Sequence, residues 1–211
     1  MKHRILGDAM QTVAIELSQG ESVFSPLGTM LFVRGGITSE TSPLGNYWTS
    51  IRSVLNVENE PPMVIYRCDS GTALVSFKVP SPGRIQTVRL DGSQRVVIRR
   101  KSLLASTEGV QFDPLILDGE RTGVITPKLF VTIAGSGTVY LHGRGNLVDI
   151  NLSEGEKIAV DGMQLLTYDD SVDTSPKPMG NPGGSGESQY MLIMHLTGPG
   201  RVLLQTLSTD N

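Results

Sequence analysis

The chain has 211 residues, of which 38% are hydrophobic and 18% charged, and its formal net charge is −3. This length accommodates one or two domains with a sizeable core, and the composition excludes an intrinsically disordered chain or a coiled coil. The charge balance excludes the strongly basic character of a general nucleic-acid binder but is compatible with a local basic patch. The 24 glycines and 12 prolines argue against a helical bundle.

The expected location is the cytoplasm. The single cysteine, Cys68, cannot form an internal disulfide, and the first residues contain no apolar stretch of signal-peptide length. No window approaches the ~18 consecutive apolar residues that a membrane-spanning helix requires.

Apolar residues two positions apart predict half-buried strands along most of the chain. The clearest alternations lie at residues 13–17, 88–90 and 148–152. A glycine turn follows each of them, which favours antiparallel pairing of neighbouring strands. The segment 46–57 departs from this pattern and predicts one short helix. Its apolar residues Trp48, Ile51 and Leu55 fall at helical spacing.

One pattern of strands and turns occurs three times. The string Ile-x-Leu-Ser-x-Gly-Glu at residues 15–21 recurs at residues 150–156, and residues 88–98 match it at their apolar positions. A second pattern, a glycine turn followed by alternating apolar residues, also occurs three times. Its copies begin at Gly71, Gly135 and Gly198. Because almost nothing precedes the first pattern and nothing follows the last, the repeat is predicted to be permuted.

The two chain ends are therefore predicted to pair and complete one module, with residues 191–207 as the closing segment. The chain is expected to form a single compact unit of three β modules. These modules are residues 1–40 plus 190–211, residues 62–110 and residues 125–170. Residues 171–189 are predicted to be a flexible loop, because their prolines and glycines oppose regular structure.

Turn glycines and strand apolar residues recur in a fixed order along nearly the whole chain. The segments concerned are Ile5-x-Gly7, residues 11–17, Gly20-Glu21-x-Val23, residues 26–30, Pro82-Gly83-x-Ile85, Gly135-x-Gly137 and Gly155-Glu156. This order resembles the bacterial members of the altered-inheritance-of-mitochondria family. The resemblance implies an all-β fold of triplicated small β-sandwich modules with pseudo-threefold symmetry. Such modules are similar to the trp RNA-binding attenuation protein and belong to the short double-stranded β-helix type. The resemblance implies no catalytic residues, because the family has none assigned.

The side chains that usually carry chemistry are few and scattered. His3, His142 and His195 fall in different modules without a His-x-His pair, so neither a bound metal nor another cofactor is expected. Cys68 is expected to be a buried hydrophobe rather than a nucleophile activated by the neighbouring Arg67.

Two carboxylates hold the same place in two of the repeats. Glu21 and Glu156 could suggest an acid–base pair, but Gln94 fills the third position and each carboxylate adjoins a turn. They are expected to be turn residues, and no catalytic residue is assigned.

The best candidate for a binding surface is the basic run at residues 95–101. On a continuous strand Arg95, Arg99 and Lys101 share one face, so three positive charges would project outward together. Such a face could bind a nucleic-acid phosphate backbone, an anionic membrane surface or an acidic protein partner. The alternative is an edge strand whose charges prevent aggregation.

The function that these observations favour is that of a non-enzymatic binding or scaffold protein that self-associates into a homo-oligomer. Modules that end in exposed strands can continue their sheets into a neighbouring molecule. The alternative is an RNA-binding or anionic-surface-binding protein that uses the basic strand. A cupin-like enzyme, the third candidate, lacks a metal-ligand set in this sequence.

Overall fold

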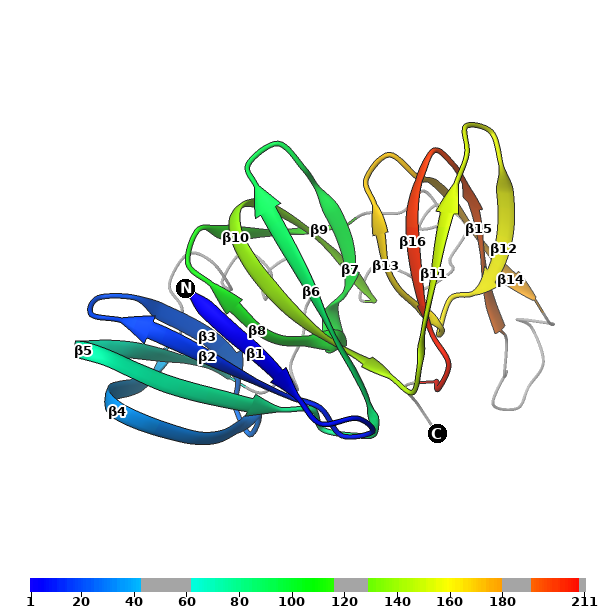
Figure 1. Cartoon of the computed structure of the whole chain (residues 1–211). Helices are drawn as coiled ribbons and strands as arrows, with labels where there is room; N and C mark the ends of the chain where they lie inside the picture. Colours follow the sequence, from blue (N-terminus) through cyan, green and yellow to red (C-terminus); the bar gives the residue numbers. More distant parts are fainter. Residues whose placement is uncertain (43–61, 116–128, 180–190, 209–211) are drawn as a thin grey trace.

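The computed structural model describes residues 1–42, 62–115, 129–179 and 191–208 (Figure 1). Their regular structure is almost entirely β, and the expected all-β class is confirmed. The one helical element within these ranges is a 3-10 turn, η1 (Arg100–Ser102). None of the described segments forms a helix long and apolar enough to cross a membrane. The segment 46–57, predicted to be helical, lies outside the described residues.

Module 1 is built around one long strand. Its strands are β1 (Lys2–Leu6), β2 (Thr12–Ser18), β3 (Ser22–Pro26), β4 (Met30–Ser42) and β5 (Met63–Lys78). The first half of β5 pairs with β3 and the second half with β2, while β4 runs along the opposite side of β5. The strand β1 extends the sheet by pairing with the outer edge of β2.

Module 2 repeats this arrangement. Its strands are β6 (Gly83–Asp91), β7 (Val96–Arg99), β8 (Leu103–Thr107), β9 (Val110–Pro114) and β10 (Phe130–Arg144). The first half of the long strand β10 pairs with β7 and β9, and its second half pairs with β6 and β8.

Module 3 repeats it again, with the long strand divided in two. Its strands are β11 (Leu147–Leu152), β12 (Lys157–Asp161), β13 (Leu165–Asp169), β14 (Asp173–Met179), β15 (Met191–Thr197) and β16 (Gly200–Gln205). Here β15 pairs with β12 and β14, and β16 pairs with β11 and β13.

The same bulge occurs in each module. The strands β4, β8 and β13 pair with β5, β10 and β16, respectively. In each of these pairings, one leucine of the first strand lies between two paired residues and has no residue opposite it. These leucines are Leu31, Leu104 and Leu166. A bulge bends a strand and increases its twist, so the three modules curve at equivalent points.

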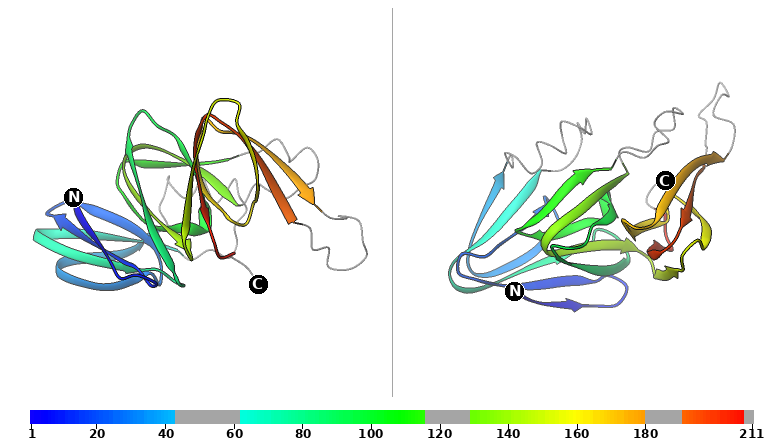
Figure 2. Two further views of the ribbon diagram at one scale, coloured as in Figure 1. Left: turned by 45° about the vertical axis from the view of Figure 1, so that its right-hand side comes forward. Right: turned by 90° about the horizontal axis from the view of Figure 1, so that it is seen from above.

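Strand pairing also joins one module to the next. Val23 and Phe24 of β3 lie opposite Thr107 and Ser106 of β8. The same kind of junction links β7 to β13. Figures 1 and 2 show the three modules side by side in chain order. The hydrophobic cores cross these junctions, because Leu104, Ala105 and Tyr140 of module 2 pack with the core of module 1.

The predicted pairing of the chain ends is wrong. The strand β1 pairs with β2, whereas β15 and β16 pair only with strands of module 3 among the described residues. Each module is therefore contiguous in sequence, and Figure 1 places the two termini in different modules. The physical reason is local, since each long strand follows directly on the strands with which it pairs.

The predicted loop at residues 171–189 is also wrong in part, because residues 173–179 form β14. This strand lies at the edge of its sheet and pairs with β15 alone in the described structure. Pro176 and Pro178 are tolerated there because an edge strand leaves alternate backbone positions outside the hydrogen-bond ladder. Residues 180–189 lie outside the described ranges.

Candidate functional site

Arg99, one of the three predicted surface residues, lies inside the protein at the junction of modules 2 and 3. Its side chain is 2% exposed. Its Nε donates a hydrogen bond to the carbonyl oxygen of Leu165 at 2.9 Å, and its Nη2 donates another to that of Gly162. The guanidinium carbon lies 5.2 Å from the centre of the Phe130 ring. Arg99 therefore holds module 3 against module 2.

The outward face predicted for Arg95, Arg99 and Lys101 does not form. The strand β7 ends at Arg99, so Lys101 is exposed on the turn η1 rather than in line with the strand. Arg95 precedes the strand and forms ion pairs with Asp113 and Asp170, at 3.8 and 3.4 Å. The alternative of a charged edge strand is wrong as well, because β10 and β13 flank β7 on its two sides.

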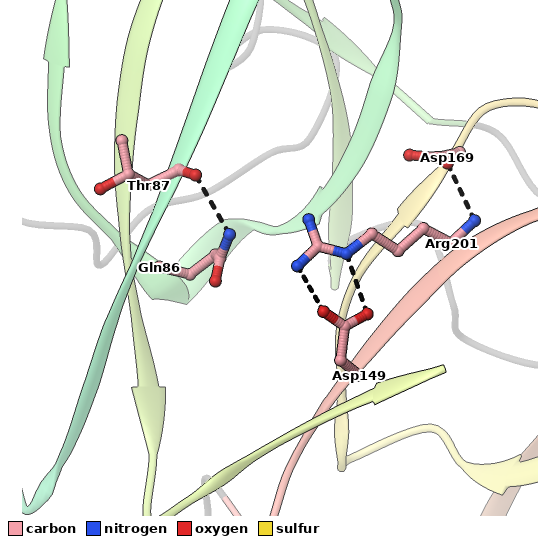
Figure 3. Close-up of polar contacts among 5 residues, drawn as sticks. All are labelled: Gln86, Thr87, Asp149, Asp169 and Arg201. Atoms are coloured by element: carbon pink, nitrogen blue, oxygen red, sulfur yellow. Dashed lines mark hydrogen bonds and ion pairs between the residues drawn. The ribbon is translucent and has the colours of Figure 1, made fainter. Parts of the chain in front are cut away.

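A cleft opens at the same junction, between β6 and the strands β13 and β16. Its cavity volume is about 120 Å³. The polar residues that line it are Gln86, Thr87, Arg89, Gln94, Thr167, Tyr168, Asp169 and Arg201. Several of them are joined by the polar contacts in Figure 3. The cleft is thus a polar depression formed by strands of two modules.

Arg201 is the most constrained of these residues. Its Nε and Nη2 donate hydrogen bonds to the two carboxylate oxygens of Asp149, at 2.9 and 2.7 Å, and its backbone N–H donates to Asp169 at 2.8 Å (Figure 3). The hydrogen bonds from Arg201 lower the pKa of the Asp149 carboxyl. The positive charge of Arg201 is therefore largely compensated within the protein.

The cleft lining also includes a second arginine, Arg89, the acidic residue Asp169 and several neutral polar groups. Burial raises the pKa of the Tyr168 phenol, which keeps it protonated at physiological pH. The Thr87 hydroxyl is buried and has no hydrogen-bond partner among the described residues. The lining residues include neither histidine nor cysteine. This arrangement offers hydrogen-bonding groups for a small polar ligand but no evident nucleophile with an adjacent base.

The junction between modules 1 and 2 is filled instead by the N-terminal strand. The His3 ring of β1 packs edge-to-face on the Tyr140 ring, with 5.1 Å between ring centres. Tyr140 corresponds in the repeat to Leu203, which lines the cleft of the second junction. The cleft thus depends on which strands meet in space, and the sequence pattern contains no signal for it.

The other residues considered as sites, Cys68, Glu21 and Glu156, contribute to the core or to turns of the described chain. Cys68 is 1% exposed and belongs to the core of module 1. The carboxylate oxygens of Glu21 and Glu156 accept hydrogen bonds from the backbone N–H groups of Ser18 and Ser153, each at 2.8 Å. The two carboxylates therefore lie at equivalent turns, as predicted, and the structure adds that they brace these turns. Within the described ranges, no group of three or more histidine, cysteine or acidic residues could hold a metal ion.

His142 predicts a pH dependence of stability. Burial, assisted by the charge of Arg144, lowers its pKa from 6.5 to about 4, although a hydrogen bond with the Ser81 backbone opposes this change. The unfolded chain therefore binds more protons between these two pH values, so stability falls as the pH decreases from 6.5 towards 4. Because a tenfold change in proton affinity corresponds to ~1.4 kcal/mol, we expect His142 to contribute a loss of about 2 to 3 kcal/mol. Urea denaturation across this pH range measures the loss.

A matched variant isolates this effect. His142→Gln places the residue found at the equivalent position of module 3, Gln205, and should reduce the pH dependence in that range. His3, whose pKa is also lowered by burial, still contributes in the variant. His195→Gln, at an exposed position of β15, controls for the exchange of a histidine for glutamine as such. Equal slopes for the unmodified protein and His142→Gln would contradict the assignment to His142.

Comparisons with known proteins agree with this architecture over nearly the whole chain. The family model described as Mitochondrial biogenesis AIM24 matches residues 3–207. The X-ray crystal structure of protein SPYM3_0169 from Streptococcus pyogenes superimposes with a TM-score of 0.75. That match covers 98% of this chain and 94% of the other at 21% sequence identity, so it shows a shared fold.

Two curated relatives have the same name, Altered inheritance of mitochondria protein 24, mitochondrial. The protein of Yarrowia lipolytica is 26% identical over 196 residues, which cover 90% of this chain and 58% of that protein. The protein of Talaromyces stipitatus is 25% identical over 183 residues, which cover 84% of this chain and 42% of that protein. The chain thus spans about half the length of these relatives.

Proposed function

The chain belongs to the mitochondrial biogenesis AIM24 family, and we propose that it is a non-enzymatic scaffold protein that self-associates and presents its surface to protein partners. The proposal rests on the contacts by which neighbouring modules join. Both junctions consist of paired strand edges with a hydrophobic core that continues across them. A contact that joins modules within one chain can also join modules of different chains.

The chemistry of the cleft supports a role in binding rather than catalysis. Among its charged residues, Arg201 is paired with Asp149, and Asp169 accepts a hydrogen bond from the Arg201 backbone N–H. The Tyr168 phenol stays protonated. Catalysis by side chains alone normally needs a base or nucleophile with a shifted pKa that can reach a substrate. The lining residues of this cleft provide polar contacts without such a group.

The alternative of RNA or anionic-surface binding has less support. Its proposed surface needs Arg95, Arg99 and Lys101 side by side, but Arg99 is buried and Arg95 is engaged by two carboxylates. Weakly paired surface cations interact with phosphates at low salt, so binding of this kind should disappear as the salt concentration rises.

Sedimentation equilibrium tests the proposal directly. We expect a mass well above the 22.7 kDa of the single chain that persists in high salt, because paired edges and apolar contacts are little screened. A monomeric mass at every protein concentration would contradict self-association. An association that high salt abolishes would indicate contacts between surface charges instead of strand edges.

A further inference from the structure

Within the part of the chain that the structure describes, two strand edges at opposite ends of the molecule lack the neighbour that their counterparts have. In the described structure β12 pairs only with β15, whereas its counterparts β3 and β7 each pair with a long strand and with the following module. Among the described residues, residues 30–34 of β4 likewise pair only with β5, whereas the counterpart strands β8 and β13 each pair with the preceding module. The two free edges are therefore the two halves of one junction.

The free edge of β4 exposes apolar residues that are buried in the other modules. Leu31 is 48% exposed, whereas its counterparts Leu104 and Leu166 are 1% and 0% exposed. Phe32 is 43% exposed, and its neighbours Met30 and Val33 are exposed to a similar degree. A run of four exposed large apolar residues on an unpaired strand edge favours association or aggregation unless another strand covers it.

The free edge of β12 shows the complementary difference. All four residues of its counterpart β7 are buried, and β13 covers that strand. In β12, Lys157 and Ala159 are exposed, and Ile158 is only half-buried. The strand is thus apolar at its centre and has an open backbone edge.

We propose that β12 of one copy pairs with residues 30–34 of β4 in a second copy, head to tail, in the register of the two internal junctions. The proposal rests on the self-association proposed above and specifies its contact. At the second internal junction, Val96, Val97 and Ile98 lie opposite Asp169, Tyr168 and Thr167. Through the repeat, β12 corresponds to β7, and residues 30–34 of β4 correspond to β13. The same register therefore places Ile158 opposite Arg34, Ala159 opposite Val33, and Val160 opposite Phe32.

This contact buries the exposed run of β4 against a strand whose second edge is also unpaired in the described structure. Because the two edges differ, the interface is heterologous, and a pair of copies joined by one contact still has one free edge of each kind. Such contacts close into a ring when the rotation between copies permits it and otherwise continue as a filament. The same interface therefore joins every pair of neighbouring copies in the assembly.

Disulfide trapping tests the register. Residues directly opposite each other on antiparallel strands have Cα atoms about 4.5 to 5.5 Å apart, within the range that a disulfide spans. The double variant Val33→Cys/Ala159→Cys should form a ladder of covalent oligomers under mild oxidation. The control Arg34→Cys/Ala159→Cys should form at least about tenfold less, because adjacent strand residues point to opposite faces. The unmodified protein, whose Cys68 is buried, measures the background.

The single variants identify other modes of association. Covalent dimers of Val33→Cys alone would show that two β4 edges pair with each other, which would overturn the head-to-tail contact. Leu31→Asp should reduce the assembly to monomers without unfolding them, because this side chain is already exposed in the single chain. Retention of the full assembly by Leu31→Asp would also overturn it.

The outcomes separate this contact from the proposed function. A protein that is oligomeric by sedimentation, with no difference in trapping between the two double variants, would retain the scaffold function and refute this contact. A protein that is monomeric at every concentration would refute both.

Discussion

Replacing Arg99 with glutamine should lower the free energy of unfolding by about 2 to 5 kcal/mol. The shorter amide cannot reach both the Leu165 and Gly162 carbonyl oxygens, which the guanidinium now satisfies inside the protein. A buried acceptor that loses its partner costs about 1 to 3 kcal/mol, and the smaller side chain also leaves space beside Phe130. Urea denaturation of the unmodified protein and the variant measures the difference.

Arg95→Gln is the matched control, four residues away in the same basic run. Its side chain is about half exposed, and its ion pairs with Asp113 and Asp170 are long. Exposed pairs of this kind contribute about 0 to 1 kcal/mol, so this variant should unfold almost like the unmodified protein. Equal stability losses for the two variants would show that Arg99 does not have the structural role assigned to it.

Deleting residues 202–211 should abolish the cooperative folding of module 3. The strand β16 lies between β11 and β13, so its removal leaves two strands without their shared partner. It also removes the buried side chains of Val202 and Leu203, which contribute about 1.5 to 3 kcal/mol each when fully buried. These losses, together with the backbone hydrogen bonds, approach the ~5 to 15 kcal/mol that stabilises a typical domain.

Amide hydrogen exchange shows which module loses its folded structure. Amides of β11 to β13 should exchange freely in the truncated protein, while those of β2 and β5 in module 1 should stay protected. Deletion of residues 1–6 is the control, because β1 is a largely exposed edge strand with a single partner in the described chain. Strong protection of β11 and β13 without β16 would contradict the central role of that strand.

Much of the local structure follows from residue pattern alone. Alternating apolar residues predicted the strands around Ile15, Val88 and Ile150, and these residues lie at equivalent positions opposite the long strands. The turns at Glu21 and Glu156 were predicted from their position beside glycines, and their carboxylates brace those turns. These features depend on residues close in sequence, so a single chain contains the information that specifies them.

The pairing partners could not be predicted in the same way. In the sequence, the first half-repeat has almost nothing before it and the last has nothing after it, which suggested that the two chain ends pair with each other. The same sequence pattern also results when each long strand pairs with the strands that precede it in its own module, as the structure shows. Alternation indicates which face of a strand is buried and contains no information about which strand lies beside it. The contiguous arrangement was therefore visible only in the tertiary structure.

The sequence by itself determined the all-β class and the recurring strand and turn pattern. Only the tertiary structure decided that Arg99 turns inward, that a cleft opens beside Arg201, and that the apolar residues of β4 stay uncovered. The physical reason is that burial is set by the neighbouring module. Leu31, Leu104 and Leu166 occupy the same place in the repeat, yet within the described structure another module covers only the last two.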